Sequence, residues 1–247
     1  MKERIDIVLV KRQMVESRAK AQARILAGEV VVGDHRIDKP GTLVAHDAEI
    51  RFKGKEQPFV SRGGLKLQEA IKSWPTLIRD AICVDVGAST GGFTDVLLKQ
   101  GARLVYAIDV GYGQLHWSLR TDARVRNMER THINKLPLNA LDPKPTVAAI
   151  DVSFISVLKV LPAVISQLAP QAQLYVLVKP QFEVGREYVE KGGIVRNAHA
   201  RTQALEKFIA AAMSLNCDVL GFKESPITGA DGNIEYICAL RWHGHKS

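Results

Sequence analysis

Four charged residues of this chain stand beside sequence that is otherwise apolar. Asp151 and Lys179 each follow an apolar run, Glu235 opens another, and Lys66 lies within a helical pattern. Ligands of open α/β sheets bind beyond the carboxyl ends of the strands, so residues that follow strands are expected at one edge. Each charge alone fits a strand-end residue that pairs with a neighbour. Four that converge on one edge predict a functional cluster of the types used in acid–base chemistry.

A glycine-rich stretch separates a predicted buried strand from a predicted helix. It reads Asp85-Val-Gly-Ala-Ser-Thr-Gly-Gly-Phe-Thr94, and it leads from the apolar run 81–86 into a helical pattern over 94–100. Glycine permits a sharp turn and lets a ligand approach the backbone. The spacing matches neither the dinucleotide fingerprint nor the phosphate-binding loop, which requires a lysine. A tight turn without any ligand is the structural alternative.

An acid ends the next predicted strand. Asp109 follows the apolar run 103–108, and an acid at this place can accept hydrogen bonds from two ribose hydroxyls. Together with the glycine-rich stretch it predicts an adenosine-type ligand without a pyrophosphate, and S-adenosylmethionine fits that description. The residues expected to bind the cofactor are Asp85, Gly87, Ala88, Ser89, Thr90, Gly91, Gly92, Phe93, Asp109 and Asp151.

The chain from about residue 59 alternates between helical and extended patterns. Helices are expected over 63–74, 94–100, 113–119, 155–168 and 200–215. Strands are expected over 81–86, 103–108, 124–128, 146–150, 173–178, 218–223 and 235–241. Strands with intervening helices predict an α/β fold with a doubly wound sheet. A loop separates the last two strands, which predicts an antiparallel hairpin and places Glu235 at the same edge as Asp151.

The beginning of the chain is basic and forms a unit of its own. Residues 1–27 contain seven basic and three acidic residues, which gives half of the net charge of +8 of the whole chain. Two short helices, a hairpin over 30–37 and a strand over 48–52 are expected. Basic helices on a small β support suit an RNA phosphate backbone, whereas solvated helix faces are the alternative. The residues expected to contact RNA are Arg4, Arg12, Arg18, Lys20 and, further on, Arg62.

Several motifs resemble known families. The segments 4–12, 17–21 and 28–33 resemble the S4 RNA-binding module over residues 1–55, followed by a linker at 56–60 and a larger domain over 61–247. The tetrad Lys66, Asp151, Lys179 and Glu235 resembles the K-D-K-E tetrad of FtsJ-like ribose 2′-O-methyltransferases. The blocks that resemble the hemolysin-A-like (TlyA) family are 61–66, 87–94, 109–114, 151–156 and 178–185.

The resemblance implies a fold and an activity. The fold would be a Rossmann-like class I methyltransferase, with a seven-stranded mixed sheet whose last strand is antiparallel, behind a small α+β S4 domain. The activity would be S-adenosylmethionine-dependent 2′-O-methylation of a cytidine in ribosomal RNA, in large-subunit RNA first and small-subunit RNA as a further substrate. The partner would be ribosomal RNA or a ribosomal subunit. Lys179 would be the base, Asp151 and Lys66 would orient the hydroxyl and tune Lys179, and Glu235 would hold a lysine in place.

Composition and the lack of certain sequence features limit the classes of function open to this chain. A pI of about 9.4 indicates a polyanionic partner. Isolated cysteines, a charged N-terminus and no long apolar run predict a cytoplasmic protein without a membrane or metal site. A membrane-lysing protein and an RNA-binding protein with an inactive methyltransferase domain are the alternatives. The glycine- and charge-rich segment 183–197 either closes over RNA or is a mobile surface loop.

Overall fold

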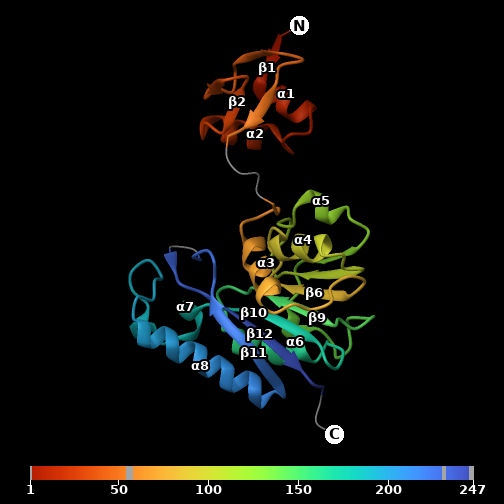
Figure 1. Cartoon of the computed structure of the whole chain (residues 1–247), viewed down its shortest axis with the longest axis vertical. Helices are drawn as coiled ribbons and strands as arrows, with labels where there is room; N and C mark the ends of the chain where they lie inside the picture. Colours follow the sequence, from red (N-terminus) through yellow and green to blue (C-terminus); the bar gives the residue numbers. More distant parts are fainter. Residues whose placement is uncertain (1, 54–57, 230–231, 245–247) are drawn as a thin grey trace. The chain divides into compact units, whose positions relative to one another are not determined.

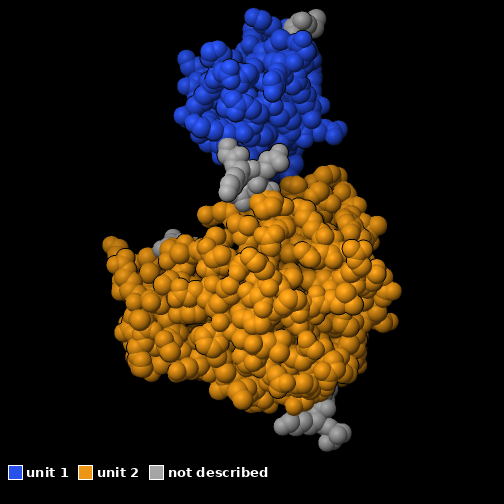
Figure 2. Space-filling model, in the orientation of Figure 1, with its two compact units in different colours: residues 1–57 blue, residues 58–247 orange. Residues whose placement is uncertain are grey.

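The chain forms two compact units. The computed structural model describes residues 2–53, 58–229 and 232–244, and the units comprise residues 1–57 and 58–247 (Figure 2). Of the predicted linker at 56–60, residues 56 and 57 lie outside the described residues. In the part of the chain that the structure describes, none of the helices has the length and apolar character needed to cross a membrane.

The first unit contains two helices and five short strands. They are β1 (Lys2–Arg4), α1 (Ile5–Lys11), α2 (Arg18–Leu26), β2 (Val30–Val32), β3 (His35–Ile37), β4 (Leu43–Ala45) and β5 (Ile50–Phe52). Strands β3, β2 and β5 form one antiparallel sheet, and β1 pairs with β4. Ser17 accepts a hydrogen bond from the Lys20 backbone N–H and so caps α2. The helices and the hairpin agree with the sequence prediction, whereas β1 and β4 were not predicted.

The second unit is built on a seven-stranded sheet (Figure 1). Its strands are β6 (Ile82–Val86), β7 (Leu104–Ile108), β8 (Val125–Met128), β9 (Val147–Ile150), β10 (Gln173–Val178), β11 (Cys217–Glu224) and β12 (Tyr236–Trp242). The spatial order is β11-β12-β10-β9-β6-β7-β8. All pairings among β6 to β10 are parallel, and β12 runs antiparallel to both of its neighbours. The predicted mixed sheet with an antiparallel last strand is confirmed.

Helices cover both faces of this sheet (Figure 1). They are α3 (Gly63–Ser73), α4 (Gly92–Lys99), α5 (Trp117–Arg120), α6 (Leu161–Ile165), α7 (Pro180–Glu183) and α8 (Ala198–Ser214), with 3-10 turns at η1 (Ile133–Lys135), η2 (Val157–Lys159) and η3 (Arg186–Tyr188). One apolar core joins α3 and α4 to the sheet, and a second joins α6 and α8 to its other face. The sheet is therefore buried on both sides, which explains the continuous apolar runs of its central strands.

Two predicted helices are shorter than expected. The region 155–168 divides into η2 and α6, because Pro162 lacks a backbone N–H and suits the first turn of a new helix. The region 113–119 contains only the short α5, since Gly113 adopts a left-handed conformation with φ of +70°. Both α-helices therefore begin later than predicted, and residues 113–116 and 155–156 form loops after β7 and β9.

Candidate active site

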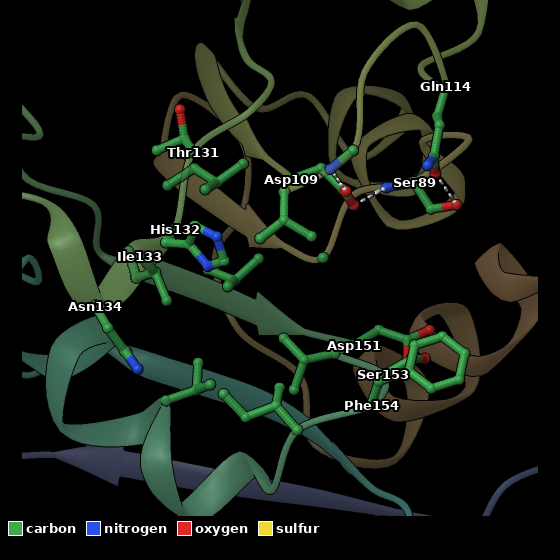
Figure 3. A pocket seen from close by; sticks show the side chains of 18 residues that line it. Ser89, Asp109, Gln114, Thr131, His132, Ile133, Asn134, Asp151, Ser153 and Phe154 are labelled. Carbon is green, nitrogen blue, oxygen red and sulfur yellow. Dashed lines mark hydrogen bonds between the residues drawn. The ribbon is translucent and has the colours of Figure 1, made fainter.

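A cavity lies at the carboxyl ends of β6, β7 and β9. Its volume is about 540 Å³, which is within the range of small-molecule sites. Figure 3 shows Asp109, Ser89 and Gln114 along one side of it, with Asp151, Ser153 and Phe154 along another. A smaller polar cavity of about 130 Å³ shares the glycine-rich loop and Asp151 with the first and adds Ser61 and Asp85 to its walls. The sheet edge predicted from the sequence is thus the edge with the cavities.

The glycines of the loop are required by protein packing. Gly87 has φ of +86°, and a Cβ there would lie 2.2 Å from the Asp151 carbonyl oxygen. A Cβ on Gly92 would lie 2.3 Å from Ser61 Oγ. The Gly87 contact is with backbone, so a side chain there would require the backbone to move, and a Cβ on Gly92 would also lie 2.9 Å from the Gly64 backbone nitrogen. The tight-turn interpretation accounts for Gly87, which packs against Asp151 at the end of β9, whereas Gly92 lets α4 approach the start of α3 closely.

Asp85 is fully buried at the end of β6. Its Oδ2 accepts hydrogen bonds from Thr94, from the backbone N–H at 2.9 Å and from the hydroxyl at 2.7 Å. Its Oδ1 has no hydrogen-bond partner among the described residues, although the side chain borders the smaller cavity. Burial raises the pKa of the Asp85 carboxyl to about 7. An unpaired buried acceptor of this kind fits a cationic donor, such as the ammonium of a methionine moiety.

Asp109 connects two loops at the other side of the large cavity. Its Oδ1 accepts from the Gly111 backbone N–H and its Oδ2 from the Ser89 backbone N–H, each at 2.7 Å (Figure 3). An ionised carboxylate has about four acceptor positions, so each oxygen retains capacity for a further donor. Asp109 borders the cavity, which is the position that ribose recognition requires. The residues present therefore fit S-adenosylmethionine at both its ribose and its ammonium end.

The four charged residues singled out in the sequence form two ion pairs. Lys66 Nζ lies 2.5 Å from Glu235 Oε2, and Lys179 Nζ lies 2.6 Å from Asp151 Oδ1. The side chains of the first pair are 9% and 2% exposed, whereas Asp151 in the second is 21% exposed. The expectation that Glu235 holds a lysine agrees with this geometry, and the lysine is Lys66.

Ser153 and Phe154 were missed as individual site residues. Lys179 Nζ donates a hydrogen bond to Ser153 Oγ at 2.7 Å. Phe154 is 92% exposed at the rim of the cavity and has φ of +65°, a costly conformation for an aromatic residue. Its ring packs against Phe182 at 5.4 Å between centroids. The sequence singled out the block 151–156 as a motif. Residue types alone predict neither the exposure of Phe154 nor its strained backbone.

The four residues of the first unit that were expected to contact RNA already have partners within it. Arg4 and Arg18 donate to the fully buried carboxylate of Asp6, at 3.0 and 2.9 Å, and Arg4 holds the pKa of that carboxyl well below its usual range. Arg12 donates to backbone carbonyls, and Lys20 pairs with Glu16. Because a guanidinium has five donors, Arg4 and Arg18 keep N–H groups for a phosphate while Asp6 fixes their position.

Family models match both units. The FtsJ-like methyltransferase model matches residues 59–242, and the S4 domain model matches residues 3–50. TlyA of Mycobacterium tuberculosis, described as a 16S/23S rRNA (cytidine-2′-O)-methyltransferase, is 41% identical over 239 residues, which are 96% of this chain and 89% of the relative. Hemolysin A of Brachyspira hyodysenteriae is 42% identical over 242 residues, which are 95% of this chain and 98% of the relative.

Solved structures agree with this fold. A candidate hemolysin from Streptococcus thermophilus superposes with a TM-score of 0.76 at 43% identity, covering 98% of this chain and 89% of that chain. A protein from Listeria monocytogenes, described as a candidate S-adenosylmethionine-dependent methyltransferase, gives a TM-score of 0.56 at 14% identity, over 74% of this chain and all of that chain. The second similarity concerns the fold alone.

Proposed function

This chain belongs to the FtsJ-like methyltransferase family and carries an S4 domain, and we propose that it methylates the 2′-hydroxyl of a cytidine ribose in ribosomal RNA with S-adenosylmethionine as the donor. The observation that carries the proposal is the Lys179–Asp151 pair at the edge of a cavity of suitable size. The description of TlyA from Mycobacterium tuberculosis as a 16S/23S rRNA (cytidine-2′-O)-methyltransferase supports the substrate.

The cofactor is assigned to the two neighbouring cavities, which share Gly87, Ser89 and Asp151 in their linings. Asp109 would accept hydrogen bonds from the ribose hydroxyls, Asp85 Oδ1 would accept from the ammonium, and residues of the glycine-rich loop would line the site. S-adenosylmethionine supplies a methyl group on a sulfonium, which is a strong donor. The protein therefore has to hold the donor, exclude water and bring the hydroxyl into line, and orientation of this kind can contribute much of the rate.

Lys179 is assigned as the base. A ribose 2′-hydroxyl must lose its proton as it attacks, and a positioned base contributes about 10²–10⁴-fold to such a step. Lys179 Nζ is held between Ser153 Oγ and the Asp151 carboxylate, so it is fixed beside the cavity. An amine accepts a proton only in its neutral form, so the step requires Lys179 as the neutral amine. Asp151 and Ser153 orient the amine, and Glu235 holds Lys66 in the second ion pair.

RNA is assigned to the S4 unit and to the rim of the cavity. In the S4 unit the candidate contacts are Arg4, Arg12, Arg18 and Lys20; Arg62 precedes α3 in the other unit and is exposed. Phe154 offers an aromatic surface on which an unstacked base can lie. Large-subunit RNA in the cytoplasm is the substrate that we favour, since the relative from Campylobacter jejuni is described as a 23S rRNA (cytidine-2′-O)-methyltransferase at 36% identity. The name hemolysin among the relatives keeps membrane lysis as the competing function.

The test is methyl transfer by a Lys179→Arg variant. Guanidinium keeps the positive charge but does not give up a proton near neutral pH, so we expect the single-turnover rate on ribosomal RNA to fall at least about 10²-fold. Lys159→Arg, at an exposed lysine of η2, is the matched control and should react at the parental rate. A near-parental rate for Lys179→Arg would show that charge, and not proton acceptance, is what Lys179 supplies.

A further inference from the structure

The segment Lys179–Glu183 is fastened to the loop 151–157 at three places. Lys179 contacts Asp151 and Ser153. Three residues later, the ring of Phe182 packs against Phe154 at an interplanar angle of 53°. Glu183 then makes two hydrogen bonds further along the same loop. The substrate-facing loop and the residue assigned as the base therefore form one connected assembly.

Glu183 uses both of its carboxylate oxygens in this contact. Oε2 accepts from the Ser156 hydroxyl at 2.6 Å, and Oε1 accepts from the Val157 backbone N–H at 2.7 Å. Ser156 in turn caps η2 through the Leu158 backbone N–H. The carboxylate is half-buried, and burial raises the pKa of the Glu183 carboxyl. A half-buried carboxylate has a desolvation cost, which these two hydrogen bonds offset.

The two ends of the loop are thereby fixed. At its start, the Asp151 backbone N–H donates to the Val86 carbonyl at 2.9 Å. At its far end, Glu183 holds Ser156 and Val157. Between these ends lies Phe154 with its left-handed backbone, a costly conformation that persists only where the surroundings enforce it. Exposure of the Phe154 ring gives little burial to offset that cost.

We propose that Glu183 is a positioning residue for methyl transfer. By holding the far end of the loop 151–157, it keeps Phe154 in its strained conformation and keeps Ser153 in reach of Lys179. The inference rests on the proposed function, because the purpose of the positioned groups is to meet the RNA and to orient the base. Glu183 has no direct contact with Lys179, and it acts on the site only through its hydrogen bonds to the loop.

Two variants of Glu183 separate its hydrogen bonds from its charge. Glu183→Ala removes both acceptors. Glu183→Gln retains them in effect, since the amide oxygen can accept from Val157 and the amide nitrogen can donate to Ser156 Oγ. Glu206→Ala, at an exposed acid of α8 outside the segment 183–197, is the matched control. We expect a single-turnover rate at saturating cofactor and RNA that falls on the order of 10²-fold in Glu183→Ala, as for a misplacement of about 1 Å, and stays near the parental value in Glu183→Gln and Glu206→Ala.

Hydrogen–deuterium exchange of the peptide covering 151–160 gives a readout that needs no substrate. Exchange should accelerate in Glu183→Ala and remain parental in the other two variants. Unchanged exchange or a parental rate in Glu183→Ala, with the protein shown by circular dichroism to be folded at the assay temperature, would overturn the proposal. So would a Glu183→Gln variant as slow as Glu183→Ala. If the parent itself fails to methylate RNA while exchange responds as expected, the proposed function is wrong and the loop-holding role of Glu183 stands.

Discussion

Removal of Lys66 or Glu235 should destabilise the methyltransferase unit far more than a surface charge would. The two side chains are 9% and 2% exposed and lie 2.5 Å apart. Loss of one partner leaves a buried charge uncompensated, which costs about 3–5 kcal/mol. Replacement of both by apolar residues of similar length removes that penalty, and such replacements are often neutral or stabilising. We therefore expect Lys66→Met and Glu235→Met each to lose about 3–5 kcal/mol and the double variant to recover most of it.

The chain offers a convenient probe for this measurement. All three tryptophans, Trp74, Trp117 and Trp242, lie in the unit 58–247. Urea unfolding followed by tryptophan fluorescence therefore reports this unit and not the S4 domain. A double-mutant cycle on the free energies of unfolding gives the coupling between the two side chains. Methyl transfer by the double variant, measured where the protein is folded, should remain far below the parental rate because the charged pair beside the site is lost.

Two results would refute this reasoning. A loss of less than about 1 kcal/mol for Lys66→Met would mean that solvent reaches Glu235 once its partner is removed, as for an exposed pair. A double variant that costs the sum of the two single variants would mean that the residues contribute through separate contacts. A double variant that is both stable and fully active would show that the pair has no role in the reaction.

Three further predictions concern the cofactor and RNA. Asp109→Ala should weaken the binding of S-adenosylmethionine by about 1–3 kcal/mol, because the ribose hydroxyls and the backbone N–H groups lose their acceptor. An unchanged affinity in calorimetry would contradict the assignment of Asp109 to the ribose. Since burial raises the pKa of Asp85 to about 7, its ionised form grows as pH rises through 7, and affinity for the cationic cofactor should rise between pH 6 and 8; Asp85→Asn should abolish that rise. Lys20→Gln should flatten the slope of log K for RNA against log salt by about 0.7–0.9, whereas Lys72→Gln in the second unit should not; equal slopes would indicate that Lys20 is merely solvated.

The elements predicted best from the sequence are those with a dense, periodic apolar pattern. The strand prediction 173–178 matches β10 residue for residue, and the other sheet strands differ at their ends by one residue. The central strands are buried on both faces, so their apolar runs are long and end sharply at Asp151 and Lys179. Because the carboxyl ends of parallel strands share one edge of the sheet, the approach of Asp151 and Lys179 at that edge could also be predicted.

Pairings between distant residues could not be predicted. The sequence does not reveal that Lys66 pairs with Glu235 and Lys179 with Asp151, since these residues come close to each other only when the sheet has formed. The buried Asp6 is a similar case: it accepts from both Arg4 and Arg18, so residues expected to face RNA also have a structural role. Charge reversal of either arginine would therefore disturb the folding of the S4 unit, and Lys20 is the cleaner probe of RNA binding.

Lys179 is the better candidate for the base than Lys66, because its partner Asp151 is accessible whereas Glu235, the partner of Lys66, is buried. A base must reach the hydroxyl that it deprotonates, within hydrogen-bond distance. The partners of Lys179, Asp151 and Ser153, both border the large cavity, so a hydroxyl placed there can replace or join the hydrogen bond to Ser153. Lys66 instead pairs with Glu235, which is only 2% exposed. A hydroxyl that reached Lys66 would have to displace a buried carboxylate, whose unpaired charge costs about 3–5 kcal/mol, whereas both partners of Lys179, the exposed Ser153 and the partly exposed Asp151, border the cavity from which the hydroxyl approaches.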